Sequence, residues 1–148
     1  MKRNIFCILT GALVVFSSCG TKSILTREIR NDVGEQIGKL QLYIDRAIIL
    51  EREVDASEPR SLKDGVYSIK EGKTYYVIEF EKELAGVINT ATATDDKLEV
   101  LFGNSDWDYL VFKNYSDNEF YQLVGTINKA DNSFWVSYGA RDYKVMQG

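Results

Sequence analysis

The stretch VYSIKEGKTYYVIEF, residues 66–80, decides the fold class. β-Branched and aromatic residues dominate it, and Glu71 and Gly72 stand at its middle, where a two-residue turn closes a hairpin. In its second half, Tyr76, Ile78 and Phe80 recur at every second position. Successive side chains of a strand point to opposite faces, so this spacing predicts a β-hairpin with one buried apolar face.

The same period of two continues on both sides of this hairpin. Leu40, Leu42 and Ile44 alternate before it, and Leu98, Val100 and Phe102 alternate after it. Further strands are expected over residues 47–54, 85–93, 108–114, 119–127, 133–139 and 141–146, separated by turns rich in Asn, Asp, Ser and Gly. The pattern predicts a mainly β protein, an antiparallel meander of about nine or ten strands that closes into a small barrel or a two-layer sandwich.

One short helix is expected before the strands begin. Leu25, Ile29, Val33 and Ile37 recur every four residues, which is the spacing of one helical stripe. Thr26 is a suitable N-cap, so the helix is expected over about residues 26–36. It would cover one end or one edge of the β-structure.

The N-terminus has the layout of an export signal. Lys2 and Arg3 precede an apolar stretch, residues 5–16, whose length as a helix is about 18 Å, well short of the roughly 30 Å core of a bilayer. The segment VFSSCG that follows, residues 15–20, resembles the lipobox of bacterial lipoproteins, with Phe16 in place of the usual Leu. This resemblance implies that residues 1–18 are a signal peptide and that Cys19 is acylated. Residues 19–23 would then be a tether and residues 24–148 a single β-rich domain.

The resemblance also bears on location. Gly20 follows the cysteine, and no acidic residue occurs before Glu28. By analogy with known lipoproteins, this favours an anchor in the outer membrane with the domain facing the periplasm, and surface exposure is the alternative. The middle of the chain resembles small uncharacterised lipoproteins of Bacteroidota, which implies a fold but no function.

Composition excludes several classes of function. The chain has no histidine, which rules out Ser-His-Asp and Cys-His nucleophiles and imidazole metal ligands. Removal of residues 1–18 takes away two of 18 basic residues and none of the 22 acidic ones, which leaves a net charge of −6 and argues against nucleic acid as a partner. We therefore expect no cofactor and no metal, and we expect a protein that is not an enzyme.

Glu51 and Glu53 are the candidate carboxylate pair. At positions i and i+2 of a strand they share one face about 6.6 Å apart, a separation that a glycoside hydrolase can use. The simpler interpretation is a solvated strand end, with Arg52 and Arg60 as surface ion-pair partners.

Aromatic residues are the better binding candidates. Exposed tyrosine and tryptophan stack on sugars or anchor protein interfaces. The candidates are Tyr43, Trp107 and Trp135. Trp107 lies in GNSDWDYL, residues 103–110, which lacks the glycine of a calcium loop and is better interpreted as an acidic hairpin turn.

Three functions remain compatible with the sequence. The first is a lipid-tethered module that binds an envelope protein or a glycan, with the membrane as a further partner through Cys19. The second is a lipocalin-like calyx for a small ligand, which requires a hollow interior. A carboxylate-based glycan hydrolase ranks last.

Overall fold

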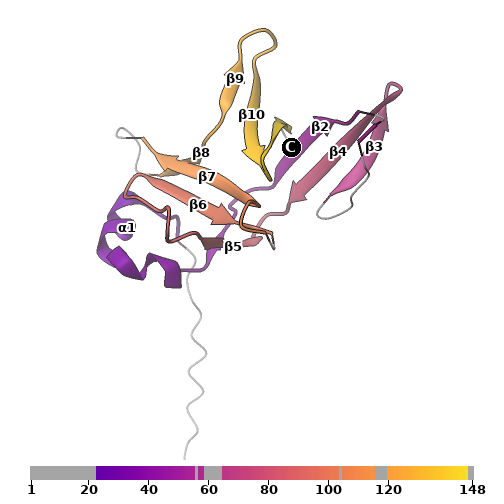
Figure 1. Cartoon of the computed structure of the whole chain (residues 1–148). Helices are drawn as coiled ribbons and strands as arrows, with labels where there is room; N and C mark the ends of the chain where they lie inside the picture. Colours follow the sequence, from indigo (N-terminus) through magenta and orange to yellow (C-terminus); the bar gives the residue numbers. More distant parts are fainter. Residues whose placement is uncertain (1–22, 56, 59–64, 104, 116–119, 147–148) are drawn as a thin grey trace, which may run out of the picture.

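The computed structural model describes residues 23–55, 57–58, 65–103, 105–115 and 120–146. The predictions for the signal peptide and for Cys19 lie outside these residues. The described part contains two antiparallel sheets and one short α-helix, which confirms the predicted mainly β fold class (Figure 1). Within it, no helix has the length and apolar character needed to span a bilayer.

The elements follow one another from the helical N-terminus to the final hairpin. They are α1 (Arg27–Val33), η1 (Gly34–Lys39), β1 (Leu42–Tyr43), β2 (Ile48–Glu53), β3 (Val66–Lys70), β4 (Lys73–Phe80), β5 (Ala85–Ile88), β6 (Lys97–Leu101), β7 (Tyr109–Asn114), β8 (Tyr121–Leu123), β9 (Thr126–Asn128), β10 (Ser133–Tyr138) and β11 (Arg141–Met146).

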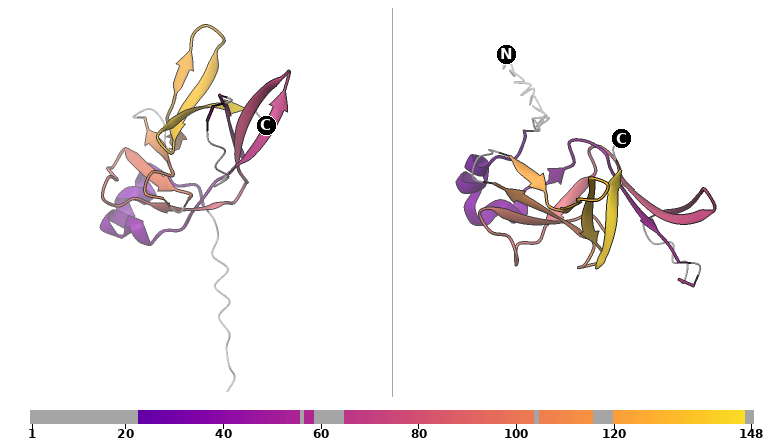
Figure 2. Two further views of the ribbon diagram at one scale, coloured as in Figure 1. Left: turned by 45° about the vertical axis from the view of Figure 1, so that its right-hand side comes forward. Right: turned by 90° about the horizontal axis from the view of Figure 1, so that it is seen from above.

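The larger sheet has six strands in the order β3-β4-β2-β11-β10-β9 and curls into a half-barrel. β11, the last strand along the chain, pairs with β2, the first strand along the chain in this sheet, with Lys144 opposite Glu51. The β3–β4 and β9–β10 hairpins splay apart on either side of these central strands, as two views show (Figures 1 and 2). The predicted hairpin is confirmed, with Glu71 and Gly72 both at positive φ in its turn.

The smaller sheet has five strands in the order β1-β5-β6-β7-β8, and the helical segment packs against it. Thr26 caps α1 by accepting a hydrogen bond from the Ile29 amide at 3.2 Å. The α-helix is shorter than the predicted 26–36 because Gly34 takes a positive φ of 53° at its end. The chain then tightens into η1, which buries Ile37.

The core consists of two clusters joined by shared aromatic residues. In the larger cluster the six-stranded sheet contributes Leu50, which is fully buried, and the five-stranded sheet contributes Leu110, which is equally buried. The smaller cluster lies under the helical segment, and Phe102 and Phe112 pack against both clusters. The predicted inward positions are confirmed in the larger sheet, where Tyr76, Ile78 and Phe80 are buried, and in the smaller sheet, where Leu98 and Val100 are buried and Phe102 is partly buried.

The predicted single strand over residues 119–127 is wrong. It forms β8 in one sheet and β9 in the other, so the chain changes sheets at Gly125. A Cβ atom there would lie 2.2 Å from the carbonyl oxygen of Trp135, so only glycine allows this close approach. Val124 still donates to the Val111 carbonyl at 2.8 Å, which holds the crossing against the smaller sheet.

Truncation of Leu50 tests the core cluster that the two sheets share. We expect Leu50→Ala to lower the free energy of unfolding by about 2–5 kcal/mol, because it leaves a cavity between the two sheets. Ile69→Ala is the control, because Ile69 is 76% exposed and its truncation should change stability by less than about 0.5 kcal/mol. Urea denaturation measures both changes, and equal effects of the two substitutions would contradict the described core.

Candidate functional site

Trp107 projects from the turn between β6 and β7. It is 67% exposed, although the loop that carries it is tightly held. Phe102 donates to the Asp108 carbonyl at 3.0 Å, and the Asp108 amide donates to the Ser105 carbonyl at 3.0 Å. The Asp108 carboxylate in turn accepts from the Ser105 amide at 3.2 Å. The backbone therefore fixes the loop, and the large indole ring is left in solvent.

A second turn supports this loop from outside the smaller sheet. The Gly139 amide donates to the Trp107 carbonyl at 3.1 Å. Gly139 and Ala140 both have positive φ and form the two-residue turn between β10 and β11. Arg141 follows directly, so the Trp107 loop lies against the turn that begins the last strand. The acidic hairpin turn predicted for this stretch is what the described residues 105–108 form.

Arg141 takes part in an arginine–glutamate cluster that the sequence did not reveal. Glu58, between β2 and β3, accepts two hydrogen bonds from Arg52, at 2.9 and 3.0 Å, and one from Arg141 at 2.8 Å. The Arg52 guanidinium also lies over the ring of Tyr143, 5.7 Å from its centre. The cluster ties the connection after β2 to β11, and no local spacing links residues this far apart in the chain.

The electrostatics of this cluster keep its groups charged. The hydrogen bond from Arg52 is the main reason that the pKa of Glu58 is lowered from its ordinary value. The same bond is the main cause of the raised pKa of Arg52, and it outweighs the opposing effect of burial. Burial raises the pKa of Tyr143. A carboxylate held in this way stays ionised at neutral pH, so it suits charge pairing better than proton transfer.

Glu51 and Glu53 share one face of β2, as predicted, but each has a lysine partner. Lys70 pairs with Glu51, which is nearly buried, and Lys73 pairs with Glu53 at 2.9 Å. Of the two arginines expected as partners, Arg52 instead pairs with Glu58 on the opposite face, and Arg60 lies outside the described residues. Both lysines come from the adjacent β3–β4 hairpin, so sheet pairing supplies the counter-charges.

The remaining predicted residues fall on two different sheets. Trp135 lies beside Lys144 in β11, which in turn lies beside Glu51, so Trp135 shares the outer face of the larger sheet with the glutamates. Its indole nitrogen donates to the Ser133 hydroxyl at 2.7 Å, and the side chain is only partly exposed. Tyr43, 46% exposed, belongs to β1 at the edge of the smaller sheet. The five candidates therefore do not form one site.

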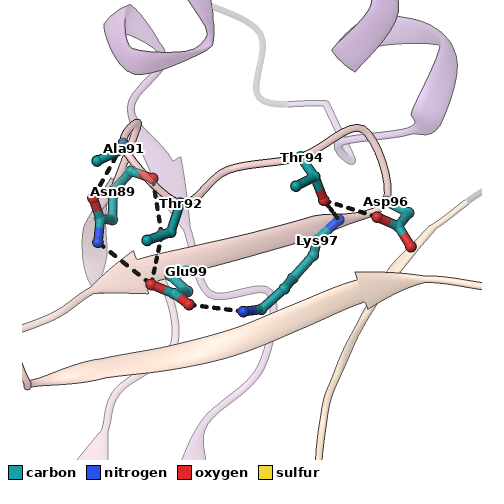
Figure 3. Close-up of polar contacts among 7 residues, drawn as sticks. All are labelled: Asn89, Ala91, Thr92, Thr94, Asp96, Lys97 and Glu99. Atoms are coloured by element: carbon teal, nitrogen blue, oxygen red, sulfur yellow. Dashed lines mark hydrogen bonds and ion pairs between the residues drawn. The ribbon is translucent and has the colours of Figure 1, made fainter.

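Glu99 is the most deeply buried carboxylate of the smaller sheet's polar network, and the sequence analysis did not single it out. Figure 3 shows its hydrogen bonds from Lys97 at 2.8 Å, from the Thr92 hydroxyl at 2.5 Å and from Asn89 at 3.4 Å. Burial opposes ionisation, yet the bonds from Lys97 and Thr92 outweigh it and lower the pKa of Glu99. Its partners lie in the β5–β6 connection and on β6, so the network holds that connection in place.

The described residues offer little for a metal ion. Among them, no group of three or more acidic or thiol side chains is placed to hold one. The exposure of Trp107 and the backbone hydrogen bonds of its loop instead make the Trp107 surface the candidate binding site. We define the Trp107 surface as Trp107 together with Glu58 and Arg141.

Neutralising Glu99 tests whether its carboxylate is structural. We expect Glu99→Gln to lower the free energy of unfolding by about 1–3 kcal/mol at neutral pH, because Lys97 and Thr92 lose a charged partner. Since the folded-state pKa is lowered, this stabilisation is present above the unfolded value of about 4.5 and is lost as the pH falls through the folded value. Urea denaturation as a function of pH measures the difference, with exposed Glu79→Gln as the control. A difference in the free energy of unfolding between Glu99→Gln and the parent protein that persists at low pH would contradict the structural role of the Glu99 carboxylate.

Comparisons with other proteins identify no relative of this chain. No protein-family model matches the chain, and no curated protein or solved structure matches it significantly. The function is therefore inferred from this chain's own sequence and geometry.

Proposed function

We propose that this protein is a lipid-anchored module of the cell envelope that binds an envelope protein or a glycan. In this proposal Cys19 carries the lipid, the anchor lies in the outer membrane and the domain faces the periplasm. The Trp107 surface is the binding site. The observation that carries the proposal is the exposure of Trp107 on a loop whose backbone is hydrogen-bonded on both sides.

The chemistry of the Trp107 surface supports binding. Exposing an indole to water is unfavourable, and a loop this well supported by its backbone does not need the ring for its own stability. Tryptophan and arginine are the residues that most often dominate the energy of protein interfaces, and an indole also stacks on sugar rings. Arg141 is half exposed and adds a charged group at the turn that contacts the loop. A rigid loop binds with little loss of conformational entropy.

The interior favours the module over the calyx. Leu50, Leu98 and Leu110 are fully buried, and Phe80 stacks edge-on against Tyr138 at 5.1 Å between ring centres. Such bulky neighbours fill an interior, whereas a calyx needs inner positions that leave room for its ligand. The hydrolase gains no support, because Glu51 and Glu53 each have a lysine partner.

The proposed lipid tether also explains how so small a site can be sufficient for binding. Attachment to the membrane raises the effective concentration of the domain near other envelope components, so modest affinity is enough. Two or more acyl chains hold a protein stably, since each buried CH₂ contributes about 0.8 kcal/mol.

Substitution of Trp107 tests the function. We expect Trp107→Ala in the full lipidated protein, purified gently from its own membranes, to reduce the bound partner by about tenfold or more, as removal of an interface hot spot does. Native mass spectrometry measures the co-purified mass, and Ile69→Ala provides an exposed apolar control.

The same spectra separate the alternatives. A second polypeptide or a glycan that depends on Trp107 supports the module. A bound small molecule of a few hundred daltons, retained in Trp107→Ala, would favour the calyx, and a mature mass without lipid at Cys19 would overturn the anchor.

A further inference from the structure

We propose that a patch beside the tether docks the domain onto the lipid bilayer in a fixed orientation. The anchor-proximal patch consists of Ile24, Tyr115 and Phe120, which are 64%, 46% and 46% exposed. This inference rests on the proposed lipid anchor at Cys19, and it adds a contact surface and an orientation to that anchor.

Backbone pairing gathers these three residues at one place. Thr26, two residues after Ile24, forms an isolated antiparallel bridge with Phe120. The Asn114 side chain donates to the Phe120 carbonyl at 3.3 Å, and Tyr115 follows Asn114 at the end of β7. The view from above shows the beginning of the described chain beside β8 (Figure 2, right). Residues from three separate parts of the sequence therefore expose apolar side chains around the point where the chain leaves the domain.

The length of the tether brings this patch to the membrane. Four residues lie between Cys19 and Ile24, so five Cα-to-Cα steps join them, and a fully extended chain of that length spans at most about 18 Å. The headgroup layer of each leaflet takes up roughly 5–8 Å of that reach. An acylated Cys19 therefore holds Ile24 within about one helix diameter of the headgroups. The face of the domain around Ile24 has to be the face nearest the lipid.

The chemistry of the patch fits the bilayer interface. Apolar and aromatic side chains partition into this region, where aromatic rings are enriched. Lys113 lies over the ring of Tyr115, 5.7 Å from its centre, and also pairs with Asp96 at 3.5 Å. The sequence also places Asp117 and Glu119 close to Phe120. Because the lysine beside the patch is paired with Asp96 and the neighbouring sequence adds acidic residues, the described residues of the patch offer no free cation for anionic lipid, and we expect apolar contact with zwitterionic lipid that is insensitive to salt.

Strand β7 then determines the orientation of the binding site. Trp107 precedes β7, and Tyr115 follows it. The six residues of β7 span roughly 20 Å at about 3.3 Å per residue. With Tyr115 at the lipid, Trp107 is held away from it, where a partner has access. The β3–β4 hairpin lies at the other end of the molecule from α1 in all three views of Figures 1 and 2.

Site-specific labelling of the full lipidated protein tests this orientation. Acylation blocks the thiol of Cys19, and the signal peptide that contains Cys7 is removed, so Ile24→Cys and Phe120→Cys each supply a single reactive thiol. Each is labelled with an environment-sensitive fluorophore and reconstituted in phosphatidylcholine vesicles that carry a headgroup nitroxide quencher. Ile69→Cys, 76% exposed on the β3–β4 hairpin, is the matched control. Unfolding midpoints equal to that of the parent protein show that the variants are folded.

We expect quenching at positions 24 and 120 to exceed that at position 69 by about threefold or more, with no loss at high salt. Equal quenching at all three positions in protein that carries its lipid overturns the docking patch but leaves the anchor intact. Loss of the difference at high salt overturns apolar docking. A mature mass without the acyl increment overturns both the anchor and this inference.

Discussion

The packing of Leu50 against the same core as Leu110 is the constraint on which the rest of the structure depends. These residues come from different sheets, and neither exposes any surface. Their shared burial requires the two sheets to pack against one core. It also fixes the strand register, because a shift of one residue would turn the apolar side chains of a strand to solvent. Phe102 and Phe112 extend the same core to the helical segment. Gly125 is the point at which the chain can pass between the sheets without separating them.

Strand β7 links this core to both proposed surfaces. Leu110 fixes the strand in the interior, so the turn before it and the residues after it have defined positions. The turn presents Trp107, and the other end presents Tyr115 beside Phe120. A short tether would otherwise let a small domain rotate freely at the membrane. In the proposed arrangement, one strand carries the binding loop at one end and the membrane-docking patch at the other, which would keep the binding site accessible.

The charged clusters around Glu58 and Glu99 stabilise connections between elements. Glu58 joins the chain after β2 to β11 through Arg52 and Arg141, and Glu99 holds the β5–β6 connection. Buried or partly buried carboxylates require such partners, since an isolated charge inside a protein is costly. The lowered pKa values of both glutamates follow from these partners, and groups that stay ionised at neutral pH are poor general acids.

The sequence by itself determined the local features of this protein. Alternation identified the β-hairpin of residues 66–80 and the inward positions Tyr76, Ile78 and Leu98, because side-chain direction in a strand depends only on neighbouring residues. The exposed Trp107 was also among its candidates, but nothing in the sequence separated it from Trp135. Sheet order, the change of sheets at Gly125 and the pairing of Glu58 with Arg141 were decided by the tertiary structure. These features join residues up to 83 positions apart, and only the packing of the whole core brings such residues together.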